Sequence, residues 1–252
     1  MKNEIILITG YAGSLGTAFT KHLLLLGHEI IGVDNNEWAV ASFGRYDNLT
    51  QILGDYSEQN YPKVDVVIHC AAYKHVDLGE SNSWEFVENN VNKYKRFLDK
   101  IKTDKLLFIS TDKAVEPISV YGYTKAIGEA LTRQNGGVVA RCGNFLSSSG
   151  SVIPLWEGQI ERSEPISITD ERMTRYVIDL QSAVVQIWQQ FRDGLQLIVP
   201  EMGEPKKLID ILGEVLKRQG FGSVDSYAPG IKIIGIRDGE KLEEKLKWEH
   251  EE

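Results

Sequence analysis

The sequence predicts an α/β fold built on a doubly wound parallel sheet, with a small lobe contributed by the C-terminal part of the chain. Three observations predict it: short apolar runs alternate with amphipathic helical stretches, a glycine-rich turn follows the first run, and the later elements are more polar and scattered. We expect residues 1–145 to form the sheet domain. Residues 146–252 should form a lobe interleaved with the sheet, because these elements are too few for an independent domain.

The composition is that of an ordinary globular protein. The 252 residues include 42% hydrophobic side chains, and the net charge of -8 with a pI near 5.3 argues against a nucleic-acid groove. No apolar run reaches the ~18 residues that a membrane span needs, and the chain enters its first strand without a cleavable leader. We therefore expect a soluble cytoplasmic protein, with Cys70 and Cys142 as buried reduced thiols and no cluster spaced for a metal.

The first strand and the turn after it predict a dinucleotide site. The pattern over Ile5–Thr9 predicts a strand, and a glycine-rich turn leads from it into a helix over about residues 14–26. Glycines let the backbone approach a pyrophosphate, and the helix N-terminus stabilises its charge. Tight turns also recruit glycine for steric reasons, but the position after the first strand favours the Rossmann interpretation. The predicted pyrophosphate contacts are Gly10, Tyr11, Ala12, Gly13, Ser14, Leu15 and Gly16.

Acidic residues at the ends of the next two strands predict contacts to an adenosine. Asp34 ends a strand over residues 29–33, where its carboxylate can accept hydrogen bonds from ribose hydroxyls and repel a ribose phosphate. This favours NAD, although Arg45 could neutralise a phosphate and admit NADP, and Asp34 could instead cap a following helix. Asp55 could meet an adenine amine or stabilise a turn. Their neighbours Asn35 and Tyr56 join the predicted cofactor contacts.

The segment after the fourth strand, residues 64–70, predicts a passage for the cofactor. Small residues at a strand's carboxyl end let a ligand pass close by, and here they precede Lys74 and His75. Because no orienting partner is evident, we expect His75 to be structural or at the substrate's edge rather than a general base. A long helix over residues 81–102 should bury Trp84, while Asn90 on it either supports the catalytic strand or is a surface amide. Ala71, Ala72, Tyr73, Lys74 and Asn90 complete this set of predicted cofactor contacts.

A Tyr-x-x-x-Lys spacing marks the centre of the chain. After an apolar strand over residues 106–109, a helix over about residues 119–134 places Tyr121 and Lys125 on one face. A nearby ammonium and a positive nicotinamide ring would lower the pKa of Tyr121, so that its phenolate takes a proton from a sugar or alcohol hydroxyl as hydride leaves. Alone, this spacing also fits a helix with a surface lysine, but Ser110 and Thr111 upstream and the glycine turn make it specific.

The elements after this helix are predicted from weaker patterns. A strand over residues 137–141 leads into Asn144, and a serine-rich loop over 147–154 precedes a helix near 155–162. A polar stretch over 169–175 immediately precedes a helix to about Phe191. The remaining predicted elements are a strand over 196–199, a helix over 207–219, a strand over 231–236 and a terminal helix from Glu240.

The glycine turn Gly10–Gly16 with Tyr121 and Lys125 resembles the extended short-chain dehydrogenase/reductase family. Six further motifs are Ala71–Val76, Ser110–Ala114, Arg141–Asn144, Gly150–Pro154, Met173–Arg175 and Arg237–Leu242. Together these six resemble the family's polysaccharide-biosynthesis branch, the UDP-N-acetylglucosamine 4,6-dehydratases. The resemblance covers nearly the whole chain and implies an NAD(P)-binding domain, residues 1–145, a nucleotide-sugar lobe, residues 146–252, and a homo-oligomer that binds a UDP-sugar. The chain is shorter than typical members after Asp55 and after Pro200, and Asp238 stands where the family has proline, which bears on substrate fit.

The resemblance implies a reaction for these residues. Tyr121 would deprotonate the hydroxyl on sugar carbon 4, Lys113 would remove the carbon-5 proton, and Asp112 would protonate the hydroxyl leaving carbon 6. This needs neutral Lys113 and protonated Asp112, which together hold as many protons as the ion pair. Thr111 would hydrogen-bond the reacting hydroxyl and Lys125 the nicotinamide ribose. The substrate contacts implied are Lys74, His75, Asn144, Val152, Ile153, Pro154, Arg175, Arg237 and Glu240.

Three functions stay open at this point. A nucleotide-sugar 4-epimerase or 4-reductase would need Tyr121 and Lys125 but no acid and base for elimination, so Asp112 and Lys113 favour the dehydratase. Those two residues could also be a strand-end salt bridge or a helix cap. A non-catalytic dinucleotide-binding protein would not need the Tyr121, Lys125 and Asp112 set at all.

Overall fold

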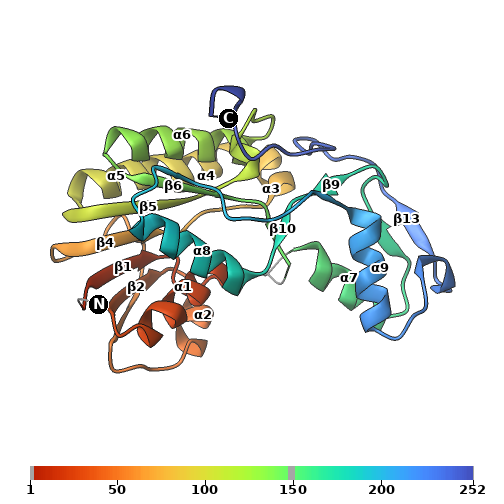
Figure 1. Cartoon of the computed structure of the whole chain (residues 1–252), viewed down its shortest axis with the longest axis horizontal. Helices are drawn as coiled ribbons and strands as arrows, with labels where there is room; N and C mark the ends of the chain where they lie inside the picture. The colour runs from red at the N-terminus through yellow and green to blue at the C-terminus, as the bar shows by residue number, and fades with distance from the viewer. Residues whose placement is uncertain (1–2, 147–150, 252) are drawn as a thin grey trace.

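The computed structural model describes residues 3–146 and 151–251, and its centre is a seven-stranded parallel sheet (Figure 1). The strand order is β11-β6-β5-β4-β1-β2-β3, so the chain winds outward in both directions from β1. The order reverses between β1 and β4, and the carboxyl ends of strands at such a switch point form a ligand crevice. The predicted fold class is confirmed. The strands are β1 (Ile5–Thr9), β2 (Glu29–Asp34), β3 (Leu49–Leu53), β4 (Val64–His69), β5 (Thr103–Thr111), β6 (Val138–Cys142) and β11 (Leu197–Ile198).

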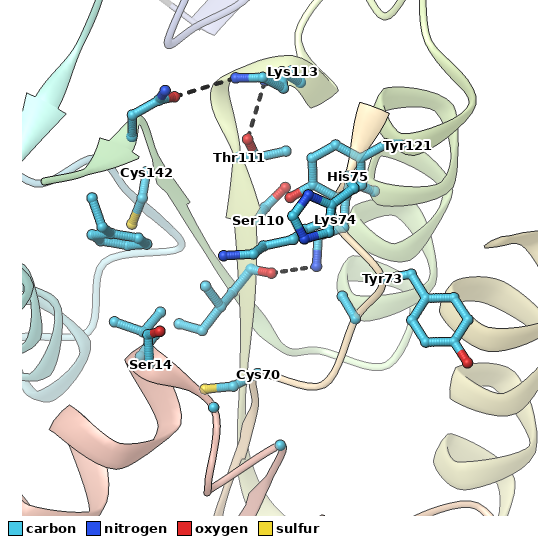
Figure 2. A pocket seen from close by; sticks show the side chains of 18 of the residues that line it. Ser14, Cys70, Tyr73, Lys74, His75, Ser110, Thr111, Lys113, Tyr121 and Cys142 are labelled. Carbon is cyan, nitrogen blue, oxygen red and sulfur yellow. Dashed lines mark hydrogen bonds between the residues drawn. The ribbon is translucent and has the colours of Figure 1, made fainter. Parts of the chain in front are cut away.

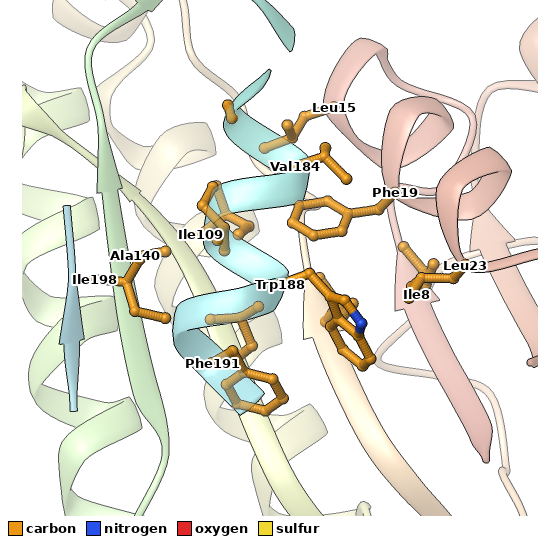
Figure 3. Close-up of a cluster of buried hydrophobic side chains, with 14 of the residues drawn as sticks. Ile8, Leu15, Phe19, Leu23, Ile109, Ala140, Val184, Trp188, Phe191 and Ile198 are labelled. Atoms are coloured by element: carbon orange, nitrogen blue, oxygen red, sulfur yellow. The ribbon is translucent and has the colours of Figure 1, made fainter. Parts of the chain in front are cut away.

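Helices cover both faces of this sheet (Figure 1). On one face α1 (Ser14–Leu25) and α8 (Leu180–Arg192) pack together, and Phe19 and Trp188 bury their rings in the main hydrophobic core (Figure 3). On the other face lie α3 (Val76–Ser81), α4 (Ser83–Val87), α5 (Lys93–Lys100) and α6 (Val120–Gln134). A short helix, α2 (Glu37–Ser42), follows β2. The sheet is therefore apolar on both faces, as a doubly wound sheet requires.

A second hydrophobic core lies in the lobe formed by the later part of the chain. Trp156 of α7 and Leu212 of α9 are fully buried in it, beside the parallel pair β8 and β13. The elements are α7 (Val152–Glu161), β8 (Ile166–Ile168), α9 (Leu208–Arg218) and β13 (Ile231–Ile233). Two short strand pairs accompany them: β7 (Asn144–Phe145) pairs with β10 (Val177–Ile178), and β9 (Thr174–Arg175) pairs with β12 (Lys206–Lys207). Between β10 and β12 the chain returns to the main sheet, where it forms α8 and β11. The binding roles expected for residues 1–145 and 146–252 stay predictions.

The segment from Arg237 onward contains no α-helix in its described part, so the predicted terminal helix from Glu240 is wrong. Contacts with the sheet domain hold this segment in an irregular path: Lys241 donates to the Val115 carbonyl at 2.7 Å and Lys245 pairs with Glu116 at 2.7 Å. Lys241 also lies 3.3 Å from Glu244 within the segment. Gly239, with φ of 78°, also breaks a helical start. Only the short turn Glu249–Glu251 is helical, in a 3-10 geometry.

The helix predicted over residues 81–102 is interrupted. It begins at Ser83, passes through a π-helical turn, Glu88–Asn92, and ends at Lys100. Trp84, expected to be buried, is 70% exposed, because the extra residue in the π turn rotates the buried face between α4 and α5. The same turn places Asn90 inside, where it is 3% exposed.

Several other boundaries differ from the predictions. β5 extends to Thr111, so Ser110 and Thr111 belong to the strand. α7 begins at Val152 rather than near residue 155, and residues 147–150 of the predicted loop lie outside the described residues. The stretch over 169–175 contains β9, and β10 separates it from α8. β13 ends at Ile233 because the backbone turns at Gly235, where φ is 85°.

Two absences hold within the described residues. None of the helices there is long and apolar enough to cross a membrane. The same residues contain no group of three or more His, Cys, Asp or Glu side chains arranged to hold a metal ion.

Candidate active site

A cavity of about 680 Å³ opens at the carboxyl ends of the central strands. Its wall combines the glycine turn after β1, the segment after β4, the end of β5, the first turns of α6 and the Cys142–Phe145 segment. In the view of Figure 2, Lys113, Thr111 and Tyr121 lie toward one end of this cavity, and Ser14 and Cys70 toward the other. The sheet's switch point has therefore brought together residues that the sequence separates by more than a hundred positions.

The glycine turn is shaped for close approach of the backbone. Gly10 has a φ of 68°, and a Cβ at Gly16 would lie 2.1 Å from the Gly10 carbonyl oxygen, which no side chain could tolerate. Gly13 is the N-cap of α1, and no side chain caps the helix there. The backbone N–H groups of the first turn therefore face the cavity with the positive end of the helix dipole behind them.

A smaller cavity of about 240 Å³ adjoins the first and shares Gly10, Gly13 and Tyr73 with it. Asp34 lines it, and its carboxylate accepts hydrogen bonds from the N–H of Ala12 at 3.2 Å and of Asn36 at 3.0 Å. The helix after β2 is capped by Asn36, not by Asp34. The carboxylate therefore stands where a ribose at the tip of β2 would meet it.

Asp55 also lines the smaller cavity, but protein groups hold its carboxylate. Lys93 lies 2.6 Å from it, and Ser57 donates from its backbone N–H and its hydroxyl. Burial raises the pKa of Asp55, and the hydrogen bond from Lys93 together with those from Ser57 lowers it by more, so its pKa lies below the usual value. The contact with adenine stays a prediction.

Tyr121 and Lys125 sit on the buried side of α6, whose N-cap Ser119 accepts a hydrogen bond from the Gly122 N–H at 3.0 Å. The Lys125 ammonium donates to the Ile109 carbonyl at 2.5 Å and lies 4.0 Å from the centre of the Phe108 ring. Burial lowers the pKa of Lys125 to about 8. Both side chains line the larger cavity.

The pKa of Tyr121 differs from the expectation. Burial raises it, the hydrogen bond with Thr111 lowers it, and the negative charges of Asp112 and Glu244 raise it further, so that the pKa lies above the usual value of tyrosine. The expected lowering by Lys125 is not present here, because that ammonium is directed to a backbone carbonyl of β5. The positive nicotinamide ring was the second expected cause, and its effect stays a prediction.

Asp112 and Lys113 form a short 3-10 turn directly after β5. The Lys113 ammonium donates to the Asp112 carboxylate at 3.0 Å and lies 3.5 Å from Glu244 and 3.4 Å from the Asn144 side-chain oxygen. Lys113 lines the larger cavity, whereas Asp112 is fully buried beneath it and accepts a hydrogen bond from Thr111 at 2.9 Å. The second carboxylate oxygen of Asp112 has no hydrogen-bond partner in the described structure.

A buried ionic network lies behind Ser110. Its hydroxyl donates to Glu129 at 2.6 Å, and the Glu129 carboxylate binds Arg141 of β6 at 2.6 Å. Arg141 is fully buried and also pairs with Glu251 of the C-terminal segment. The Arg141–Asn144 motif of the sequence therefore contains a structural arginine followed by three residues that line the cavity, Cys142, Gly143 and Asn144.

Most of the predicted cofactor contacts line one of the two cavities. Three do not: Tyr11 is buried in the core against Gly32, the Ala12 N–H binds Asp34, and Asn90 binds the backbone of Tyr73. The residues that line them are Gly10, Gly13, Ser14, Leu15, Gly16, Asp34, Asn35, Asp55, Tyr56, Ala71, Ala72, Tyr73, Lys74, Ser110, Tyr121 and Lys125.

Of the predicted substrate contacts, Lys74, His75 and Asn144 line the larger cavity. Arg175 does not: it is 5% exposed and donates to the carbonyls of Thr174 and Leu242, because its guanidinium joins two backbone segments of the lobe. Outside the cavity lining are also Val152, Ile153 and Pro154 in the first turn of α7, and Arg237 and Glu240 on the C-terminal segment.

Two buried acids, Glu129 and Glu244, and one wall of the cavity were not predicted from the sequence. Glu244 belongs to a run of alternating charges, and such a run predicts an exposed face, so no signal distinguished it. The wall is formed by Leu78, Asn82, Glu85 and Phe86 of α3 and α4. The one feature of the sequence that could have indicated this wall is the interruption of the helical pattern at Asn82.

The chain matches a family described as polysaccharide biosynthesis protein over residues 6–252. A capsular polysaccharide biosynthesis protein, CapD, of Staphylococcus aureus is 33% identical over 98% of this chain, and this chain spans 45% of that protein. A UDP-N-acetylglucosamine 4,6-dehydratase (inverting) of Campylobacter jejuni is also 33% identical, over 95% of this chain and 76% of that protein. A UDP-glucose 4-epimerase of Rickettsia typhi is 31% identical over 97% of this chain and 77% of that protein.

Solved structures show the same fold. The crystal structure of DesIV, a dTDP-glucose 4,6-dehydratase of Streptomyces venezuelae with NAD bound, superposes with a TM-score of 0.84. The superposition covers 96% of this chain and 88% of that one, at 20% sequence identity. At this identity the likeness concerns the fold alone.

Proposed function

The chain belongs to the polysaccharide biosynthesis protein family, and from that premise we propose that it is an NAD-dependent nucleotide-sugar 4,6-dehydratase. Its substrate would be a UDP-N-acetylglucosamine-type sugar, and its product a 4-keto-6-deoxy sugar for a surface polysaccharide or glycan. The observation that carries the proposal is that Tyr121 and the Lys113 amine line the same cavity, at the switch point of the sheet. Tyr121 with Lys125 suffices for oxidation, whereas Lys113 adds a second proton acceptor, which elimination requires.

The residues at the glycine turn fit an NAD molecule. The absence of side chains at Gly10, Gly13 and Gly16 leaves room for a pyrophosphate to approach the N-terminus of α1, and the two cavities adjoin there. The carboxylate of Asp34 would bind the adenosine ribose, and Lys125 the nicotinamide ribose. When bound, NAD would accept the hydride from carbon 4 and return it to carbon 6, so that the net reaction loses only water.

In the proposed first step, Tyr121 takes the proton of the carbon-4 hydroxyl while Thr111 hydrogen-bonds the same oxygen. The raised pKa of Tyr121 in the described structure means that its phenolate is scarce there. A positive charge beside the ring, from the bound cofactor and from a rotated Lys125, would favour the phenolate. The side chain of Lys125 is long enough to exchange its carbonyl contact for a ribose hydroxyl.

In the proposed second step, Lys113 takes the proton of carbon 5, which the neighbouring ketone has acidified, and Asp112 donates a proton to the hydroxyl leaving carbon 6. When the hydride returns to carbon 6, the Lys113 ammonium would give a proton back to carbon 5, so that the steps sum to the loss of one water. The contact between the two groups at 3.0 Å lets a proton pass from Lys113 to Asp112 beforehand without proton uptake from water. Because Asp112 is sealed beneath the cavity, this role requires the substrate to reach its unpartnered oxygen. A substrate-bound structure with Asp112 still sealed would remove it from the mechanism.

A 4-epimerase is the second candidate, favoured by the Rickettsia relative. An epimerase also oxidises carbon 4, but it returns hydride to the same carbon and needs no base at carbon 5. Asp112 and Lys113 would then be a structural ion pair. Lys113 is therefore a catalytic base in the dehydratase and a structural residue in the epimerase.

One experiment separates these functions. Purified protein with NAD is incubated with UDP-N-acetylglucosamine, and the products are analysed by mass spectrometry and NMR. We expect a product lighter by one water, with a ketone at carbon 4 and a methyl group at carbon 6. A product of unchanged mass with the carbon-4 configuration inverted would contradict the dehydratase and support the epimerase. Bound NAD without any turnover would contradict both.

A further inference from the structure

Glu244 is a buried carboxylate on a segment without regular secondary structure. Its side chain is 2% exposed, and its two oxygens lie 3.5 Å from the Lys113 amine and 3.3 Å from the Lys241 amine. Burying a carboxylate costs free energy unless it is paired and hydrogen-bonded. The C-terminal segment therefore places this charge next to the Lys113 amine, and the segment is held there because Lys241 donates to the Val115 carbonyl at 2.7 Å.

The Lys113 amine is surrounded by acceptors from three parts of the chain. Asp112 belongs to its own turn, Asn144 comes from β7, and Glu244 comes from the C-terminal segment. A lysine side chain has many rotamers, and holding its amine at one place costs entropy that such contacts offset. Acceptors on separate elements fix the amine in space, whereas Asp112 alone would move together with it.

We infer that Glu244 is a positioning residue that holds the Lys113 amine in the cavity, so that the C-terminal segment is part of the active site. The inference rests on the proposed function, in which Lys113 is the base at carbon 5. Figure 2 shows Lys113 at the cavity end that Thr111 and Tyr121 also occupy, where a held amine could meet a sugar.

The charges around this position are balanced. Asp112 and Glu244 are two acids, and Lys113 and Lys241 are two amines, so the net charge is zero when all four are ionised. It is also zero after one proton has passed from Lys113 to Asp112. Glu244 and Lys241 can stay ionised during that transfer, and Glu244 then accepts an N–H of the neutral amine. This arrangement lets the reactive pair become neutral without leaving an unpaired charge in the protein.

The competing explanation is that Glu244 only tethers the C-terminal segment. The test compares four proteins: wild type, Glu244→Gln, Glu244→Asp and, as matched control, Glu243→Gln, whose side chain is exposed next to Glu244. Melting temperatures identify any variant that fails to fold. Turnover of UDP-N-acetylglucosamine is measured against pH, and deuterium incorporation at carbon 5 from D₂O follows the step assigned to Lys113.

For Glu244→Gln we expect kcat to fall by about tenfold or more, with KM within about twofold, because a displaced base slows the step and not the binding. The titratable groups around Lys113 are Asp112, Tyr121 and Glu244, with Lys241 behind Glu244. Removing one negative charge favours the deprotonated forms of the lysine and the tyrosine, so the acidic limb of the kcat profile should move to lower pH. Glu244→Asp should keep the wild-type profile and part of the rate. A purely structural tether would change melting but leave the profile of the folded variant unmoved, and that result would overturn the inference.

A second readout does not depend on turnover. The rate at which acetic anhydride acetylates Lys113 is measured by peptide mass spectrometry in wild type, Glu244→Gln and Glu243→Gln. A carboxylate beside the ammonium protects it, so we expect labelling of Lys113 to rise about threefold in Glu244→Gln alone. Equal labelling in all three proteins would refute the contact. If the contact is present but wild type turns over no nucleotide sugar, the proposed function fails while the positioning of Lys113 stands.

Discussion

Replacing Lys113 by methionine tests the chemistry and the packing of the site together. The substitution keeps most of the side-chain stem and removes the ammonium that two buried carboxylates, Asp112 and Glu244, face at 3.0 and 3.5 Å. Removing one partner of a buried ion pair costs about 3–5 kcal/mol. Because Lys113 is 18% exposed and Glu244 keeps Lys241, we expect the lower end, about 3 kcal/mol of unfolding free energy. For a chain of this size, that lowers the melting temperature by about 6–12 °C.

The effect on turnover should be larger than the effect on folding. Without the base at carbon 5, dehydration should fall by about 10²–10⁴-fold, the usual contribution of a general base. Oxidation at carbon 4 depends on Tyr121, so the variant should still bind NAD and accumulate the reduced cofactor after addition of substrate. The assay follows NADH absorbance in a stopped-flow instrument and product by NMR.

The double variant Lys113→Met with Glu244→Gln separates the two effects. It removes one of the two buried carboxylates that the Lys113 ammonium faced, so it should regain part of the lost melting temperature but none of the lost dehydration. Product formation by Lys113→Met at the wild-type rate would refute the assignment of the base. Unchanged melting would refute the argument from the buried carboxylates.

Three further predictions follow from the same geometry. Tyr121→Phe should lower the rate of carbon-4 oxidation by about 10²–10⁴-fold with NAD still bound. In wild type this rate should rise with pH up to at least about pH 9, because burial raises the pKa of Tyr121 and the deprotonated form is the active base. A pH-independent oxidation rate over this range would contradict it. Gly16→Ala should abolish NAD binding in calorimetry, since the new Cβ would lie 2.1 Å from the Gly10 carbonyl oxygen. The control is Gly213→Ala inside α9, where the nearest atom to the new Cβ lies at 3.8 Å, and this variant should raise the free energy of unfolding by about 0.5–1 kcal/mol. Asp34→Ala should raise the NADP-to-NAD ratio of kcat/KM by about tenfold or more, because the carboxylate that would repel a ribose phosphate is removed, and an unchanged ratio would disprove that role.

Local patterns predicted the main sheet and the helix α6 well. The strands Ile5–Thr9 and Val138–Cys142 are short apolar runs whose length and punctuation suffice for assignment, and the cap at Ser119 marked the start of α6 within one residue. These features depend on neighbours in sequence. The Tyr121 and Lys125 spacing was visible for the same reason, since one helical turn brings them together.

Predictions failed where a distant contact decides the conformation. The run from Glu240 to Lys247 has a composition suited to a helix, but its side chains bind groups more than a hundred residues away, such as Val115 and Lys113. Arg175 has the chemistry of a phosphate ligand, yet backbone carbonyls of the lobe take up its guanidinium. Trp84 was misplaced because a single π turn changes which face of a helix is buried.

The sequence by itself determined the seven strands of the main sheet, the glycine turn, the acid at the tip of β2 and the spacing of Tyr121 and Lys125. All of these follow from backbone geometry over a few residues. Only the tertiary structure decided which charges meet. It sealed Asp112 beneath the cavity, directed Lys125 to the Ile109 carbonyl and brought Glu244 to Lys113. The energy of a charge depends on its burial and on partners from any part of the chain, and neither is encoded in local spacing.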